Sequence, residues 1–144
     1  MADLSITATQ VQPVTGHSRQ IDGIAGEAII PGQVVASDSS SGSKLIKLFD
    51  ADSTNTYLNT AVGLAANEAL ASGQPIKYES GDQINIGTSA APVVGKVYLG
   101  SRTPGGITPA GDSTNTGYVN VIGVGMASGK LNLILSASGV TGQI

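Results

Sequence analysis

The chain has 144 residues, which suits one domain, and its net charge of −3 comes with only 12% charged residues. Affinity for nucleic acid comes mainly from Lys and Arg side chains that contact phosphates, so seven scattered basic residues argue against a nucleic-acid partner. The absence of cysteine excludes disulfides and thiolate metal sites. No apolar run approaches the ~20 residues of a membrane helix, and the first residues lack the features of a signal peptide. We therefore expect a soluble chain made in the cytoplasm, with no membrane partner.

The hydrophobic pattern predicts many short strands. Leu131, Leu133 and Leu135 share one face of a period-two pattern, which would turn them toward a core, and this period recurs along the chain. Clusters of Gly, Pro, Ser and Asp between the apolar stretches predict turns. Such a pattern is typical of an all-β sandwich or barrel-like domain. The expected strands cover residues 4–9, 26–30, 33–37, 44–49, 61–65, 76–79, 83–87, 94–99, 118–126 and 131–135.

Four segments carry more specific local signals. Residues 65–71 are rich in Ala and Leu and favour a short helix, with an irregular continuation of a strand as the alternative. Pro31-Gly32 suits the centre of a type II turn and predicts a hairpin between the two flanking strands. Residues 80–82, Ser-Gly-Asp, predict a further turn. The two glycines in residues 122–125 predict a bulge or a close approach of backbones.

An internal repeat is visible in the sequence. Residues 52–56 and 112–116 both have the sequence DSTNT, and each copy precedes a Tyr-x-Asn triplet. A small apolar strand with Gly63 or Gly123 follows, and Ala-Ser-Gly then precedes another strand in both copies. This order predicts two similar loop–strand–turn–strand units, as pseudo-symmetric halves of one sheet system. Chance similarity within a Ser/Thr/Asn-rich chain is the alternative.

Residues 1–22 differ from the remainder, residues 23–144. Termini are poorly ordered unless contacts hold them. In this segment Leu4, Ile6, Val11 and Val14 are the apolar residues that could make such contacts. Two interpretations remain open: an arm whose apolar residues contact a neighbouring molecule, or the first strand of the domain itself.

Candidate catalytic and metal-binding residues are few. His17 is the one histidine, and no Gly-x-Ser-x-Gly element is present to supply a serine nucleophile, so we expect a solvated or contact histidine. The loop 50–55 has alternating oxygen-bearing side chains like the start of a calcium loop, but Asn55 and Ala61 replace the Gly and Glu of that pattern. We expect a polar loop there, and the sequence leaves open whether it binds a cation.

The acidic residues could in principle include a glycosidase pair. Most of them fall in predicted turns, where Asp is expected for turn chemistry. Aromatic platforms for a sugar are scarce, since the chain has one Phe, four Tyr and no Trp. We therefore expect no enzyme activity, no cofactor and no metal. The acidic residues are Asp3, Asp22, Glu27, Asp38, Asp50, Asp52, Glu68, Glu79, Asp82 and Asp112.

The order of several Gly-punctuated segments resembles the capsid cement (decoration) protein family of tailed phages. The resemblance covers roughly residues 23–136, and each motif alone is common, so their order is what supports it. The motifs are aGxxIxpGxvV at 25–35, avGlA at 61–65, GxxIxI at 81–86, GxvYL at 95–99 with pGGIT at 104–108, and vxvIGxa at 119–126 before the apolar strand 131–135.

The resemblance implies a β-rich domain, often a homotrimer, on the outside of an assembled capsid. There it would bind the major capsid protein and stabilise contacts between its subunits. The low charge of the chain agrees with large neutral contact surfaces, because few charges lose their water on contact. Residues 1–22 are not covered, so a capsid contact by Leu4, Ile6, Val11 and Val14 is a separate expectation.

Two other classes fit the sequence less well. The Gly-x-Val-Tyr-Leu and Gly-Gly-Ile-Thr elements also resemble modules of phage fibres and spikes, which would act in host recognition or attachment. A β-clip or carrier-type domain could share the Pro31-Gly32 turn, but no lysine stands at a hairpin tip for lipoyl or biotinyl attachment.

Overall fold

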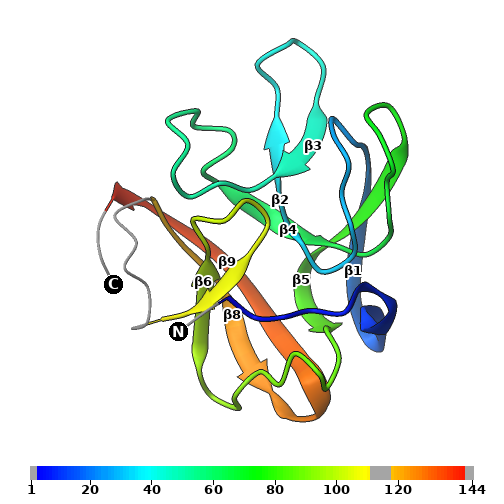
Figure 1. Cartoon of the computed structure of the whole chain (residues 1–144), viewed down its shortest axis with the longest axis vertical. Coiled ribbons are helices and arrows are strands. Elements are labelled where there is room, and N and C mark those ends of the chain that lie inside the picture. The colour runs from blue at the N-terminus through cyan, green and yellow to red at the C-terminus, as the bar shows by residue number, and fades with distance from the viewer. Residues whose placement is uncertain (1–2, 111–117, 142–144) are drawn as a thin grey trace.

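The computed structural model describes residues 3–110 and 118–141, and half of them belong to one antiparallel sheet that curls into a half-barrel (Figure 1). This confirms the expected all-β, barrel-like class. Two short 3-10 turns, η1 (Ala8–Gln10) and η2 (Ala127–Gly129), are the helical elements of the described residues, and neither has the length to cross a membrane. The strands are β1 (Gln12–Ile24), β2 (Val34–Asp38), β3 (Leu45–Leu48), β4 (Ala61–Ala65), β5 (Pro75–Asn85), β6 (Val97–Gly100), β7 (Ile107–Pro109), β8 (Tyr118–Met126) and β9 (Lys130–Thr141).

The two halves of the sheet have the same strand order, running outward from the centre of the sheet in opposite directions. The whole order is β3-β2-β4-β5-β9-β8-β6-β7, with β1 paired to β5 outside this path. We call β2–β5 the first repeat and β6–β9 the second repeat, because β2 corresponds to β6, β3 to β7, β4 to β8 and β5 to β9. This confirms two similar units in one sheet. The second DSTNT copy, with Asp112, lies outside the described residues.

The registers of the two repeats agree residue by residue. Val35 of β2 lies opposite Gly63 and Leu48, and Tyr98 of β6 lies opposite Gly123 and Pro109. In both repeats a register shift follows directly at the next residue of β2 or β6. A shift at the same place shows that the bulge belongs to the repeat, since bulges re-aim strands at defined positions.

Gly63 and Gly123 explain why both repeats have glycine at this place. A Cβ atom on Gly63 would lie 2.2 Å from the carbonyl oxygen of Glu79, and one on Gly123 would lie 2.3 Å from that of Asn132. These carbonyls belong to the following strand, β5 or β9. Glycine is therefore required because the two backbones approach too closely for a side chain, as the sequence indicated for 122–125.

The turns that lead into β2 and β6 also have the same hydrogen bonds. Gly32 donates its N–H to the carbonyl of Ala65, and Gly95 donates to that of Gly125, both at 2.9 Å. Both glycines have positive φ, 91° and 81°, which glycine adopts without the strain of a Cβ atom. We call residues 30–34 the covered turn and residues 93–97 the exposed turn, for reasons that follow from their surroundings.

The apolar core has two parts. The larger cluster draws on both repeats, and Leu131 and Leu133 are buried in it with Leu135 packed against it, which confirms the expected core face. The smaller cluster involves the first repeat and the segment before it, with Ile46, Ile76 and Tyr78 among its members. Burial raises the pKa of the Tyr78 hydroxyl.

A buried asparagine connects the two repeats. The Asn120 side chain in β8 accepts the N–H of Ala61 at 3.0 Å and donates to the carbonyl of Asn59 at 2.9 Å. Asn120 is only 2% exposed, so its amide depends on these two backbone partners. They lie where β4 begins, and the side chain therefore fixes the start of the first repeat's central strand against the second repeat.

Several local expectations were wrong. Residues 26–30 form no strand, and Ile29 makes only an isolated bridge. The helix favoured over 65–71 is absent, and the segment is instead the alternative, an irregular continuation of the strand in which Ala69 pairs with Ile29. Residues 80–82 are part of β5, where Asp82 takes a positive φ of 59°, so the predicted turn is a kink within one strand. Residues 4–9 form no strand, and the first strand instead begins at Gln12.

The Pro31-Gly32 turn forms, but its flanking segments do not pair with each other. Gln33 donates its N–H to the carbonyl of Ile30 at 3.3 Å, which closes the turn. The preceding residue Ile29 pairs with Ala69, whereas Val34 pairs with Leu64. The turn therefore joins two separate pairings and is not a hairpin.

Candidate functional site

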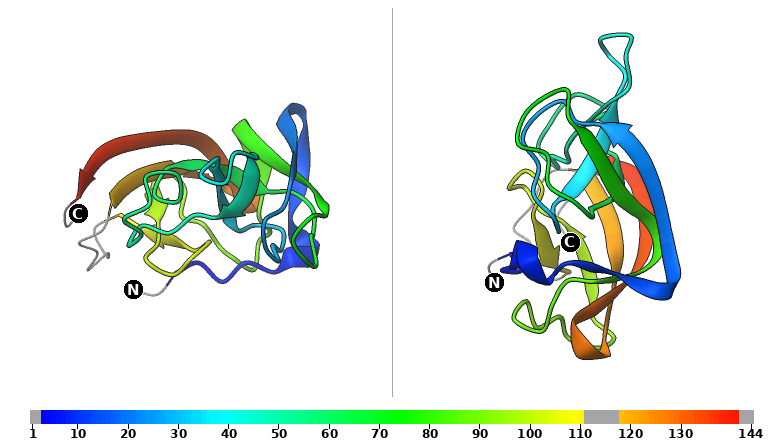
Figure 2. Two further views of the ribbon diagram at one scale, coloured as in Figure 1. Left: turned by 90° about the horizontal axis from the view of Figure 1, so that it is seen from above. Right: turned by 90° about the vertical axis from the view of Figure 1, so that its right-hand side faces the viewer.

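The N-terminal segment, residues 3–11, lies across the open side of the half-barrel (Figures 1 and 2). Leu4 donates its N–H to the carbonyl of Ile107 in β7 at 2.8 Å, and the Asp3 carboxylate accepts the Ser101 hydroxyl at 2.7–2.8 Å. Leu4 and Ile6 pack against the larger core cluster, and Val11 is buried in it. Three of the four expected contact residues therefore contact their own domain.

Val14, the fourth of these residues, is half-buried in β1. The expected boundary between residues 22 and 23 falls inside β1, which runs Gln12–Ile24 along β5. Residues 12–22 thus belong to the sheet. The structure describes one chain, and a contact of Leu4, Ile6, Val11 and Val14 with a neighbouring molecule stays a prediction.

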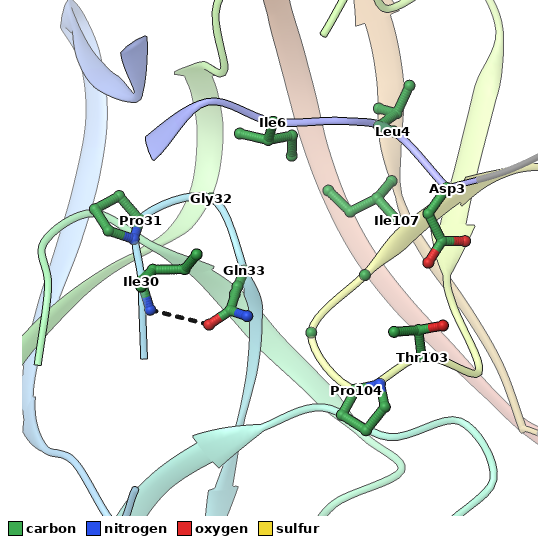
Figure 3. A pocket seen from close by; sticks show the side chains of 12 residues that line it. Asp3, Leu4, Ile6, Ile30, Pro31, Gly32, Gln33, Thr103, Pro104 and Ile107 are labelled. Atoms are coloured by element: carbon green, nitrogen blue, oxygen red, sulfur yellow. Dashed lines mark hydrogen bonds between the residues drawn. The ribbon is translucent and has the colours of Figure 1, made fainter. Parts of the chain in front are cut away.

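A groove separates the covered turn from the turn that joins β6 to β7, and the N-terminal segment passes over it (Figure 3). The groove encloses about 240 Å³, and its walls are largely apolar. The Ile30 N–H donates to the Gln33 side-chain oxygen at 2.9 Å within the covered turn, which forms one wall of the groove. The groove contains no pair of acidic side chains, since Asp3 is the one acidic residue among those that line it. This favours an apolar contact over catalysis there.

The residues weighed for chemistry lie apart. His17 is exposed in β1, with its Nδ1 3.4 Å from the Asp82 carboxylate. The Asp52 carboxylate of the 50–55 loop accepts the Arg102 Nε–H at 3.0 Å, and Asp50 accepts the Asp52 N–H at 2.9 Å. Within the described residues, no three His, Asp or Glu side chains gather as a metal site. The loop is therefore held by its own turn bonds and an arginine.

Glu79 is a buried carboxylate at the end of the expected strand 76–79. It is fully buried in β5, where it accepts the Ser18 hydroxyl at 2.7 Å and the Arg19 N–H at 2.9 Å. Both donors come from an irregular part of β1, between its register shifts. The role of Glu79 is to hold β1 onto β5, since a buried carboxylate is stable only with such donors. Period-two patterning alone could not find it.

Large apolar side chains are exposed at several places on a surface with few charges. They lie on β1, on the two turns, on the β3–β4 and β4–β5 connections and on β9, and a chain with so few charged residues leaves them open to contact. They are Ile21, Ile24, Ile30, Tyr57, Leu70, Val93, Val94, Val97 and Ile134, each 38% to 70% exposed.

The edge strands of the sheet differ in whether another segment of the chain covers their outer side. The outer edge of β3 is covered by Gly26, which donates its N–H to Ile46 at 2.8 Å, and that of β7 by Leu4. In contrast β1 pairs within the described residues with β5 alone and is the outermost strand of a long curved ribbon (Figure 2). A free strand edge is a surface that can pair with another chain.

Comparison of the chain with protein-family models, with curated proteins and with solved structures found no match. The functional conclusion therefore depends on the residues, the fold and the resemblance of the motifs.

Proposed function

We propose that the protein is a structural, non-catalytic protein that binds the outside of an assembled tailed-phage capsid and stabilises contacts between major capsid subunits. The observation that carries the proposal is the surface: among the residues that the structure describes, nine large apolar side chains are exposed, on a chain with 12% charged residues. Side chains of this kind form the centres of protein–protein interfaces, where charged residues are depleted. The ordered motifs over residues 23–136 supply the phage capsid context.

A fibre or spike module is the second candidate. Intertwined chains would leave the core of one chain incomplete. Here the N-terminal segment returns to its own core, with Val11 buried and Leu4 bonded to Ile107. A core completed within one chain favours a decoration protein, which must fold alone before it binds a finished shell.

The test is to compare purified virions made with and without the gene for this chain. We expect the protein in a fixed ratio to the major capsid protein, and heads without it to break at a lower temperature, because a partner bound only to the assembled shell stabilises that shell. A few copies per particle, located at the tail, would support the fibre alternative. Absence from virions would reject both.

Trimerisation is tested separately by sedimentation equilibrium of the isolated protein. We expect a species of three times the 14.3 kDa chain mass. A monomer in solution that forms threefold clusters on the capsid would limit the trimer to the capsid surface.

A further inference from the structure

The covered turn and the exposed turn have the same backbone but different surroundings. A Cβ atom on Gly32 would lie 2.7 Å from Ile6 and 3.1 Å from Val11, because the N-terminal segment packs directly on this turn. A Cβ atom on the equivalent Gly95 would meet no atom within 4 Å. The described chain therefore covers one copy of this turn and leaves the other open.

The open copy is also the more apolar at its surface. Val93 is 56% exposed and Val94 is 68% exposed, and Val97 at the start of β6 is 38% exposed. The residue equivalent to Val97 in the first repeat, Val34, is completely buried. The three valines flank Gly95 and the half-buried Lys96, and this turn is located beside the β8–β9 hairpin at the lower end of the molecule in Figure 1.

The exposed turn is fixed in place before any partner binds. The N–H of Val93 donates to the Tyr98 hydroxyl at 2.8 Å, and the N–H of Lys96 donates to the Val93 carbonyl at 3.1 Å. Gly95 and Gly125 add a further bond at 2.9 Å. A partner would meet a preformed surface, and binding to such a surface loses little conformational entropy.

The covered turn indicates which kind of partner fits. Residues 4–11, Leu-Ser-Ile-Thr-Ala-Thr-Gln-Val, contain no charged side chain and place Ile6 and Val11 against Gly32. We propose that the exposed turn, residues 93–97, is a docking site for an extended, uncharged segment of a partner protein that presents aliphatic side chains. The inference rests on the proposed function in that the partner would be a capsid subunit, but the chemistry of the site follows from the repeat.

The experiment uses a blocked synthetic peptide of residues 4–12 as the probe and the full-length 15N-labelled protein as the target. We expect its amide resonances to shift with peptide concentration at residues 93–97. Val94→Asp should weaken binding at least tenfold, because the charge would have to lose its water on contact. Leu70→Asp is the matched control, since Leu70 is 70% exposed outside this turn, and should leave binding unchanged. A peptide with Ser in place of Leu4, Ile6 and Val11 should not bind.

The inference is overturned if millimolar peptide shifts no resonance in residues 93–97, or if Val94→Asp binds as the parent protein does. Shifts confined to residues 30–34 would also overturn it, since the peptide would then only exchange with the chain's own N-terminal segment. The outcome is separable from the proposed function. Peptide binding by a protein absent from virions would keep this inference and reject the capsid role, whereas presence in virions without peptide binding would do the reverse.

Discussion

The two repeats share a backbone but complete it with different parts of the chain. Each uses a glycine at the same close approach of strands, Gly63 or Gly123, and each enters its first strand through a turn with the same hydrogen bonds. The cover differs. The edge of β3 is paired by Gly26, from the segment just before the first repeat, and that of β7 by Leu4, about a hundred residues earlier in the chain. Local geometry is thus repeated, and protection from solvent is supplied separately.

The equivalent turns that follow β2 and β6 also share a local geometry but are completed by different parts of the chain. Asp38 accepts the N–H of Ser40 at 2.9 Å, and the equivalent Ser101 accepts the N–H of Thr103 at 3.1 Å. Asp38 brings its own carboxylate and pairs with a lysine of β3, whereas Ser101 donates to the carboxylate of Asp3. The second repeat therefore depends on the N-terminal segment for a charge that the first repeat carries itself.

The largest difference between the repeats is expected from the central strands. Leu64 of β4 is completely buried, whereas the equivalent Val124 of β8 is only half-buried. Leu64→Ala should lower the free energy of unfolding by about 2–5 kcal/mol, the range for buried Leu truncations, and Val124→Ala by clearly less. Urea denaturation measures both. Equal losses would show that the half-buried position is as tightly packed as the buried one.

Substitutions of Gly63 and Gly123 test whether the two repeats are equivalent where their backbones approach closely. Gly63→Ala and Gly123→Ala should each cost about 1–3 kcal/mol, the range for overpacking, because the added Cβ would meet a backbone oxygen. The two losses should agree, since the distances to Glu79 and Asn132 differ by only 0.1 Å. Ser72→Ala, in the exposed β4–β5 connection, is the control and should change little. A large loss at one glycine alone would mean that the repeats differ in how far they relax.

The cover is tested on the two turns. Ile6→Ala should lower stability by about 1–2 kcal/mol, less than a fully buried truncation, because Ile6 is partly buried over the covered turn. Val94→Ala on the exposed turn should stay within about 0.5 kcal/mol, as for surface positions. Thermal unfolding of both variants gives the comparison. Similar losses would place a contact on the exposed turn that the single chain does not contain.

The smallest effect is expected with acid. Hydrogen bonds from the Ser40 hydroxyl and N–H, with the Lys47 ammonium nearby, lower the pKa of Asp38 from 3.8 to about 2. Because the folded-state pKa lies below the unfolded value, this stabilisation is present above pH 3.8 and is lost as the pH falls toward 2. Asp38→Asn should flatten the fall of the unfolding midpoint in that window.

Ser40→Ala provides a second variant for this prediction that keeps the carboxylate. It should raise the pKa of Asp38 toward its usual value and flatten the same part of the profile, though less than Asp38→Asn. An acid profile unchanged in both variants would show that Asp38 is not held by these donors in solution.

The sequence predicted the parts of the fold that depend on local pattern. The bounds of β4 and β8 agree with the expected 61–65 and 118–126, because alternation and glycine are visible in one dimension. The prediction from sequence failed where the conformation of a residue depends on a partner far away in the chain. Residues 80–82 resemble a turn, yet β1 and β9 on either side keep them in β5. The burial of Glu79 likewise depends on Ser18, which no pattern within β5 could indicate.

The sequence predicted which residues of the N-terminal segment make apolar contacts, but it did not predict what they contact. Leu4, Ile6 and Val11 were expected to make apolar contacts, and they do so with their own core. The open valines of residues 93–97 were missed because Val94 and Val97 fall within an expected strand, 94–99, and Val93 lies directly before it. The signal that could have found them is the match of Gly95 with Gly32, which becomes clear only when the two turns are superposed in register.

The contacts of the N-terminal segment also set the time at which the protein can fold. Asp3 and Leu4 are synthesised before their partners Ser101 and Ile107, which follow about a hundred residues later. Pairings between such distant residues form slowly, because a long loop must close before any contact compensates for it. The β7 edge and the core beneath Ile6 therefore stay open at least until β7 has been synthesised, and the nascent chain is exposed to aggregation during that interval.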